Sequence, residues 1–292
     1  MKSSNKGKDF CVFALPGLFC FLAVVMVPFI YGIYLTLTDW NGVSSVKNFV
    51  GLSNFAAVMR DAQFWKSLLL TFKYVIAVVV LVNVIAFLLA YILTRGIKGQ
   101  NFFRAGFFTP NLIGGIVLGY IWQLLLNGVL LYMNRTLTYS SVYGFWGLVI
   151  LMCWQQIGYM MIIYIAGLQA VPEDMLEAAR IDGANRWQTL WRVTIPNVMP
   201  SITICMFLSL TNGFKLFDQN LALTAGRPFQ QLGNGETIKT TEMLALNIVN
   251  AFGTSGGGNR GVGQAKAVIF FIVVAAISII QLQANRRKEV QQ

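Results

Sequence analysis

The side chains in this sequence that could act on a small molecule are mostly amides and aromatic rings set within long apolar runs. The sequence has no histidine, so the commonest general base and transition-metal ligand is missing. Cys11, Cys20, Cys153 and Cys205 all fall in apolar runs without CxxC spacing, which indicates small apolar fillers. No nucleophile with a base and no metal cluster is recognisable in the sequence. The pattern favours binding over catalysis, and a membrane-bound enzyme fits it poorly.

Candidate binding residues lie in the middle and outer parts of several apolar runs. Planar amides and aromatic rings suit a site that holds a polar solute by hydrogen bonds and ring contacts. Gln155, Gln156 and Tyr159 stand out as a group, since polar groups in lipid must find partners or water. Any one candidate alone fits packing or an interhelical hydrogen bond better. Lys215 and Asp218, three residues apart, also fit an ion pair on one helix. The candidates are Asn111, Trp122, Gln155, Gln156, Tyr159, Asn212, Phe214 and Asp218, with Gln123 and Trp154 beside them.

The composition places these residues in a membrane protein. Hydrophobic residues make up 56% of the chain and charged residues 11%, whereas a soluble domain has about 25% charged residues. The net charge of +11 could indicate nucleic-acid binding, but the basic residues lie in short clusters between apolar runs rather than on one face. Membrane topology explains them better, and no nucleic-acid partner is expected.

Six apolar segments are long enough to cross a bilayer, which takes about 20 residues of helix. The first follows three lysines like a signal peptide, yet it is too long and lacks a cleavage site, so we expect it to be retained. The expected fold is therefore an all-α integral membrane protein with six transmembrane helices. The spans are 10–37, 67–94, 107–131, 143–168, 197–217 and 262–284, within one six-span domain over 10–284.

The distribution of Lys and Arg predicts the orientation, because cytoplasmic segments carry an excess of them. Twelve lie in the set of segments that contains both termini, and seven lie in the longer opposite loops. The N-terminus 1–9, the tail 285–292 and the loop 170–196 are therefore expected in the cytoplasm. Outside, the segment 253–258 is glycine-rich and predicts a flexible surface loop. No lysine-serine or lysine-threonine pair follows it, so it does not resemble a nucleotide loop.

The predicted cytoplasmic loop 170–196 contains a polar helix. Pro172, Glu173 and Asp174 suit the start of a helix, and Gly183 can adopt the left-handed conformation that ends one. This predicts a helix over Glu173–Asp182. Asn185 can cap a second helix whose apolar side suits the membrane interface, with arginines meeting lipid headgroups. The residues of this second helix are Arg186, Trp187, Leu190, Trp191, Arg192 and Thr194.

An amphipathic inner loop without a partner would explain these features too, but the sequence also resembles a known family. Glu177-Ala178-Ala179, Asp182-Gly183-Ala184 and Ile195-Pro196, with Pro200 beyond, resemble the EAA loop of the membrane subunits of ABC importers. The resemblance implies the type I ABC importer transmembrane fold. It also implies that the loop forms a coupling helix seated in a cleft on an ATPase subunit. Glu177 would pair with a basic ATPase residue, Ala178 and Ala179 would permit a close fit, and Asp182 and Gly183 would complete the turn.

A second block is similar to carbohydrate importer permeases. Residues 213–228 resemble a Phe-Lys-x-Phe-Asp…Leu-Thr-x-Gly-x-Pro pattern, and residues 49–55 and 110–122 also resemble that group. The family favours glycines where this chain has Ala225 and Arg227. The resemblance implies a maltose- or oligosaccharide-type permease in the bacterial cytoplasmic membrane.

The same resemblance implies several partners and no cofactor in this chain. The partners are a second homologous permease, two ATPase subunits that bind ATP and Mg, and an extracellular or periplasmic sugar-binding protein. Two alternatives remain open. The same machinery could carry another polar solute, such as a glycerol phosphate or a polyamine. An ion-coupled secondary transporter fits less well, because no Asp or Glu falls at the centre of a span.

Overall fold

The computed structural model describes residues 10–233, 235–253 and 260–286. The predicted N-terminal segment 1–9, most of the predicted tail 285–292 and most of the glycine-rich segment 253–258 lie outside these residues. The chain divides into two compact units, residues 1–61 with 248–271 and residues 62–247 with 272–292. Within the described residues, five helices are long and apolar enough to cross a membrane, or six if one bent pair counts as a span.

In the first unit, the first predicted span is helical from Phe10 to Leu35. Wider π-helical turns precede Pro16 and Pro28, because proline lacks an N–H and its ring crowds the carbonyl one turn back. On the last segment, the ring of Phe29 meets Phe271 edge-on with centroids 4.9 Å apart. Phe271 belongs to the C-terminal helix α14 (Arg260–Arg286). The segments of the first span are η1 (Phe10–Ala14), α2 (Leu15–Phe21), η2 (Leu22–Met26) and α3 (Val27–Leu35).

The segment after α3 contains the short helix α4 (Ser53–Arg60). Buried Asn54 donates hydrogen bonds of 2.8 Å to the carbonyls of Thr36 and Thr38, and so holds α4 against the end of α3. Hydrogen bonds from the side chain and backbone of Asn48 lower the pKa of Asp39 in the intervening loop. Specific side-chain hydrogen bonds therefore hold the segment that follows α3.

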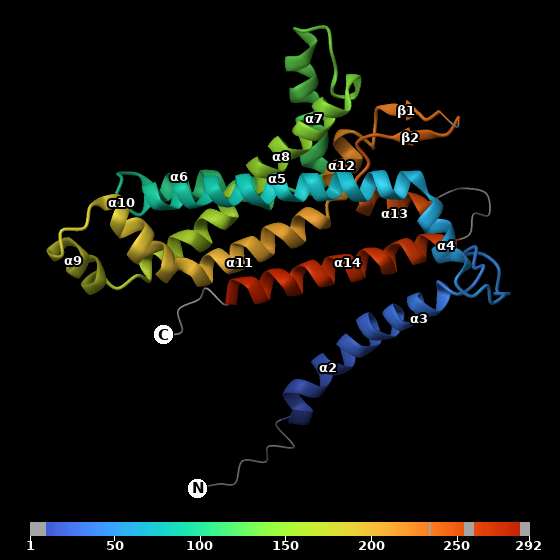
Figure 1. Ribbon diagram of the computed structural model, residues 1–292, viewed down its shortest axis with the longest axis horizontal. Helices are drawn as coiled ribbons and strands as arrows, with labels where there is room; N and C mark the ends of the chain where they lie inside the picture. The colour runs from blue at the N-terminus through green and yellow to red at the C-terminus, as the bar shows by residue number, and fades with distance from the viewer. Residues whose placement is uncertain (1–9, 234, 254–259, 287–292) are drawn as a thin grey trace. The chain divides into compact units, whose positions relative to one another are not determined.

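The second unit is built on three packed helices, α5 (Ala62–Leu93), α8 (Ser141–Gln169) and α11 (Ile195–Phe214) (Figure 1). One polar chain joins all three. The Tyr164 hydroxyl on α8 donates to Asn83 Oδ1 on α5 at 2.7 Å, and Asn83 Nδ2 donates to Ser209 Oγ on α11 at 2.8 Å. These groups satisfy one another within apolar surroundings, where an unpaired polar group is costly.

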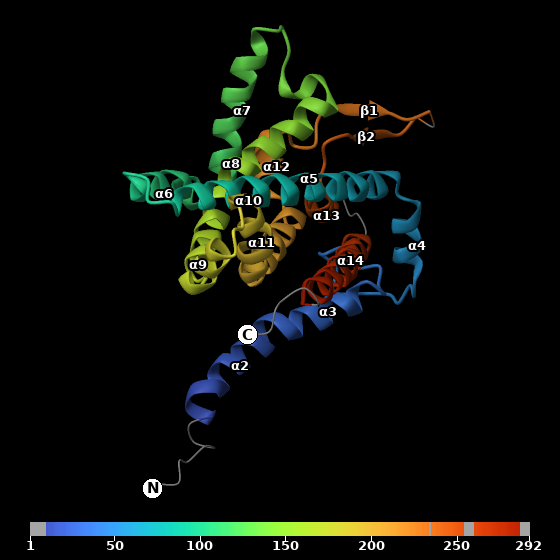
Figure 2. The same ribbon diagram turned by 60° about the vertical axis from the view of Figure 1, so that its left-hand side comes forward.

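The predicted third span, 107–131, is wrong as a single helix. The chain instead forms α6 (Gln100–Phe108) and the 3₁₀ turn η3 (Thr109–Leu112), followed by α7 (Gly115–Leu131). The two parts meet at an angle of 103°, and Figures 1 and 2 show α7 projecting away from α6. Pro110 and Gly114 lie at the break, and these residue types disfavour a continuous helix.

The predicted fifth span, 197–217, also ends early. Helix α11 stops at Phe214, and a separate helix α12 (Asp218–Leu223) follows. Lys215 lies in the break and Asp218 begins α12, so the two residues do not share a helix. The structure describes both side chains and forms no ion pair between them, so the ion pair that the sequence left open as an alternative is absent.

The two polar segments of the second unit lie at opposite ends of it in both views (Figures 1 and 2). At one end, α12 leads to an antiparallel hairpin and to α13. The other end holds the short elements of the loop 170–196. The elements after α12 are β1 (Phe229–Gln231), β2 (Thr237–Lys239) and α13 (Leu244–Gly253). The loop elements are α9 (Glu173–Ile181), α10 (Arg186–Thr189) and η5 (Leu190–Thr194), and a further turn, η4 (Leu137–Tyr139), precedes α8.

Gly158 gives a test of how α8 packs against the end of α6. A Cβ at Gly158 would lie 1.8 Å from the Phe107 carbonyl oxygen, and a backbone atom cannot swing aside. We expect Gly158→Ala to destabilise the protein by about 1–3 kcal/mol or more, as overpacking does. Thermal unfolding in detergent, followed by the loss of monodisperse protein, measures this.

Gly106→Ala is the matched control, because nothing lies within 4 Å of a Cβ at Gly106 on α6. We expect it to change stability by no more than about 0.5 kcal/mol. Equal melting temperatures for the two variants would contradict the described contact.

Candidate functional site

A pocket of about 200 Å³ lies where the two helix breaks of the second unit meet the side of α8. It combines η3, α8, the end of α11 and the start of α12, so four segments distant in sequence contribute to it. Four of the predicted binding residues line it: Asn111, Gln155, Gln156 and Asn212. The other lining residues are Met152, Lys215, Leu216 and Gln219.

The two neighbouring glutamines of α8 have different surroundings. Gln155 is engaged on both sides: its Oε1 accepts from Gln219 Nε2 at 2.8 Å, and its Nε2 donates to the Ile113 carbonyl at 3.4 Å. Gln156 is only 5% exposed, and its Oε1 has no hydrogen-bond partner in the structure. An unpaired buried acceptor costs about 1–3 kcal/mol, so this oxygen is available to a solute hydroxyl.

The other predicted binding residues do not line the pocket. Phe214 is buried in the core, where its ring meets Phe72 edge-on at 5.6 Å between centroids. The Trp122 ring packs edge-on against Trp154 at 5.5 Å. Tyr159 is half-buried elsewhere on α8, and Asp218 is exposed at the first position of α12.

Sequence reasoning missed Lys215, Gln219, Met152 and Leu216 as pocket residues. In the sequence, Lys215 and Asp218 also fitted an ion pair on one continuous helix, but the break after Phe214 separates them. Gln219 has the same type of side chain as Gln155 and Gln156, but it lies beyond the predicted end of the fifth span at residue 217. Met152 and Leu216 are apolar and carry no signal in the sequence.

The predicted coupling helix is present as α9. Glu177, Ala178 and Ile181 lie at i, i+1 and i+4 and share an exposed face, on which Ile181 is 86% exposed. Ala179 points the other way and is buried within this chain. Of the two alanines, only Ala178 is therefore available for close approach by another protein. Ile181 therefore places one apolar group on the exposed side of an otherwise polar helix.

The end of α9 is fixed by local backbone chemistry, as the sequence predicts. Gly183 has a φ of +74°, the left-handed conformation that favours glycine. The amides of Asp182 and Ala184 donate to the carbonyls of Ala178 and Ala179, each at 2.9 Å. Asn185 then starts α10 in a capping box with Gln188, so the turn between α9 and α10 has a defined geometry.

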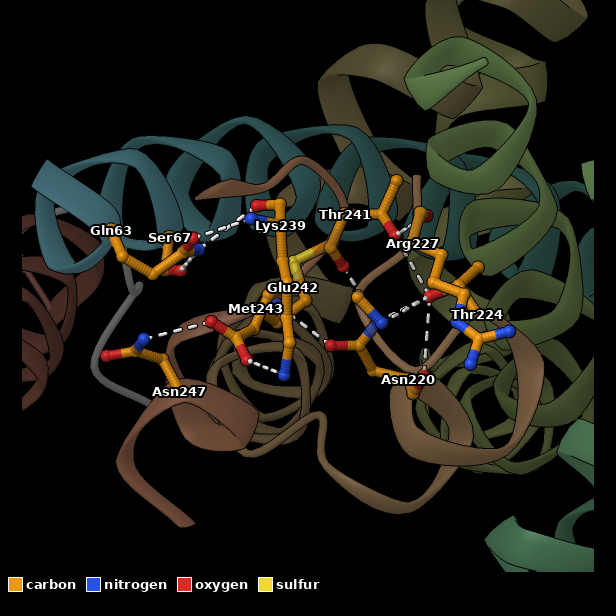
Figure 3. Close-up of polar contacts among 11 residues, drawn as sticks. Gln63, Ser67, Asn220, Thr224, Arg227, Lys239, Thr241, Glu242, Met243 and Asn247 are labelled. Carbon is orange, nitrogen blue, oxygen red and sulfur yellow. Dashed lines mark hydrogen bonds and ion pairs between the residues drawn. The ribbon is translucent and has the colours of Figure 1, made fainter. Parts of the chain in front are cut away.

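The hairpin end of the second unit is held by a buried polar network (Figure 3). Asn220 on α12 is fully buried; its Nδ2 donates to the Thr241 carbonyl, and its Oδ1 accepts from the Met243 amide, both at 2.8 Å. The buried Glu242 carboxylate pairs with Lys239 Nζ at 3.1 Å and accepts from Asn247 Nδ2 at 2.9 Å. The segment after the hairpin is thereby tied to α12.

The hairpin itself is tied to α5 by one amide. Gln63 Nε2 donates to the Lys239 carbonyl at 3.0 Å, while Gln63 Oε1 accepts from the Lys239 amide at 2.7 Å. Figure 3 shows both contacts beside Ser67, which accepts from the same Gln63 Nε2. The hairpin is therefore held against α5 by hydrogen bonds rather than left as a free loop.

Comparison with known proteins identifies the family. Residues 83–290 match the family model described as the binding-protein-dependent transport system inner membrane component. The chain belongs to this family. Membership as a transport permease decides against the ion-coupled secondary transporter, and it makes this chain a membrane component of an ABC importer.

Relatives and solved structures of the same kind cover nearly the whole chain. A probable starch degradation products transport system permease from Thermoanaerobacterium thermosulfurigenes is 44% identical over 99% of this chain and 98% of its own length. A multiple sugar-binding transport system permease from Streptococcus mutans is 30% identical over 90% of both chains. A chain of a bacterial alginate ABC transporter, solved with an alginate pentasaccharide-bound periplasmic protein, shares the fold with a TM-score of 0.76 over 96% of each chain at 17% identity.

Proposed function

We propose that this chain is the membrane-spanning permease of an ABC importer for a sugar or oligosaccharide. The observation that carries the cargo class is the pocket lined by amides, with the free Gln156 acceptor in it. Sugars present many hydroxyl groups, each a donor and an acceptor, and planar amides pair with them well. The relatives at 44% and 30% identity are named for starch degradation products and multiple sugars, which supports the same class.

The pocket lining also separates sugars from the charged alternatives. Its polar groups are five amides and one cation, Lys215, beside apolar Met152 and Leu216. A polyamine would need carboxylates there, and a phosphate ester is usually clamped by arginine. An uncharged polyhydroxyl solute fits the amides, while Lys215 can donate to its hydroxyl groups.

We further propose that α9 couples this chain to ATP hydrolysis in separate subunits. Its exposed face presents Glu177, Ala178 and Ile181, which can give a charge contact, a close approach and an apolar anchor. The structured turn at Gly183 and the capping box of α10 lead into η5 and α11, and Asn212 near the end of α11 lines the pocket. A push on α9 would therefore move a pocket-lining helix as a rigid body, the basis of alternating access.

The proposed assembly contains this chain, a second homologous permease, two ATPase subunits that bind ATP and Mg, and a sugar-binding protein. Both termini and α9 lie in the cytoplasm, and the hairpin lies outside. The charge bias of the sequence supports this orientation. The placement of α9 and the hairpin at opposite ends of the second unit supports it too.

The cargo class can be tested with the complete importer, co-expressed from its native gene neighbourhood in a host lacking sugar uptake. We expect ATP-dependent accumulation of at least one labelled sugar from a panel of maltose, maltotriose, trehalose and raffinose. Spermidine and glycerol 3-phosphate serve as the charged comparison. Uptake of either charged solute and of no sugar would overturn the proposal.

Gln156→Met tests the free acceptor in the pocket. Methionine has a similar volume but does not offer the carbonyl oxygen, so the hydrogen bond to the solute is lost. We expect the KM of uptake to rise about 5- to 30-fold, the equivalent of a net hydrogen bond of about 1–2 kcal/mol. An unchanged KM would show that this oxygen does not meet the solute. Gln100→Met, on α6 and outside the pocket, is the control.

Glu177→Ala tests the coupling face. We expect ATP-driven uptake into membrane vesicles to fall at least about tenfold while the complex keeps its melting temperature, since removing one partner of an interface charge pair costs about 2–5 kcal/mol. ATP hydrolysis continues but no longer drives uptake. Glu173→Ala, the same change one turn earlier, should retain uptake. Normal uptake by Glu177→Ala would contradict the assigned role.

A further inference from the structure

One wall of the pocket depends on a chain of two glutamines. Gln219 on α12 donates to Gln155 on α8, and Gln155 donates in turn to the Ile113 carbonyl. Ile113 ends η3 with an extended backbone at the break before α7. Three elements that meet at the pocket are thus linked through a single side chain, Gln155.

The approach of Gln219 to this site requires a glycine on α7. A Cβ at Gly115 would lie 2.9 Å from Gln219 Nε2 and 2.9 Å from the Asp218 Cβ. One turn later, a Cβ at Gly119 would lie 2.5 Å from the Ala222 Cβ. These two small residues let α7 lie directly against α12 and leave the Gln219 amide the space it occupies.

Helix α12 is fixed from its other side by the residue next to Gln219. Asn220 is fully buried, and its amide group bonds the segment that follows the hairpin, as Figure 3 shows. Asn220 Nδ2 also donates to Thr224 Oγ1 at 3.0 Å. The position of Gln219 is therefore set by contacts outside the pocket, which is what a side chain needs in order to orient another.

We infer that Gln219 is a positioning residue of the solute pocket and sets solute affinity through Gln155. With Gln219 in place, the Gln155 carbonyl is occupied, so its amide is held toward Ile113 and Gln156 is the free acceptor of the pair. Without Gln219, Gln155 can rotate and offer its own carbonyl, and the pocket loses its fixed pattern of donors and acceptors. This inference rests on the proposed function of the pocket.

A double-mutant cycle tests it in the complete importer, with labelled maltotriose as the probe. The variants are Gln219→Met, Gln155→Met and the double substitution, and methionine keeps the volume without the amide. We expect each single change to raise the KM about 3- to 10-fold, with Vmax within about twofold of the wild type, as for a lost hydrogen bond of about 1 kcal/mol. The double variant should show the KM of a single one, since both act through the same contact.

Two results would overturn the inference. Multiplied KM effects in the double variant would show that Gln219 meets the solute itself. An unchanged KM in Gln219→Met would show that it does not position the pocket. Gly115→Ala is a second variant that displaces the Gln219 amide without removing it, and it should raise the KM in the same way. Gly128→Ala, with nothing within 4 Å of its Cβ on the same helix, should not.

The same cycle measured by thermal unfolding separates this inference from the proposed cargo. We expect the melting-temperature shifts of Gln155→Met and Gln219→Met to be non-additive whatever the transported solute. If the wild type accumulates none of the four panel sugars, the cargo assignment fails while this coupling is still observed. Additive melting-temperature shifts together with normal maltotriose uptake would contradict the Gln219–Gln155 coupling and leave the cargo assignment intact.

Discussion

The constraint on which the structure depends is that every backbone polar group removed from water needs a partner. Long helices meet it internally, so the problem arises where a helix stops. In this chain, side-chain amides supply hydrogen bonds to backbone groups outside regular helices. Gln155 donates to the Ile113 carbonyl and Gln123 to the Leu223 carbonyl. Asn220 donates to the Thr241 carbonyl and accepts from the Met243 amide. Gln63 does the same for Lys239. These amides provide hydrogen bonds to backbone groups that have no partner within a helix.

The solute pocket follows from the same constraint. It forms where the break after η3 and the break after α11 meet α8, because interrupted helices leave space and direct polar side chains into it. Gln155 and Gln219 bond to each other there, whereas the Gln156 carbonyl oxygen has no partner.

Rigid contacts extend from this pocket in both directions along the second unit. Toward the hairpin, α12 presents Gln219 to the pocket and Asn220 to the buried network of Figure 3. Toward the other end, α11 follows α10 and η5 directly, and α9 with its exposed face precedes them. The polar chain through Asn83 joins α11 to α5 and α8 between these ends. The two ends of the second unit are therefore joined by packed, hydrogen-bonded elements, which is the connection that the proposed coupling requires.

The sequence by itself determined the features that depend on local chemistry: the apolar spans, the polar helix that ends at Gly183, and the capping role of Asn185. Family resemblance added the transport class, which the family match confirms, and the residue types predicted four of the eight pocket residues. Only the tertiary structure decided where the third and fifth spans break. The hydrophobicity of an apolar run is the same whether the run folds as one helix or as two. It also decided that Phe214 packs in the core and that Gln219 reaches Gln155. Side chains of one type differ only in their neighbours, and those neighbours come from distant segments of the chain.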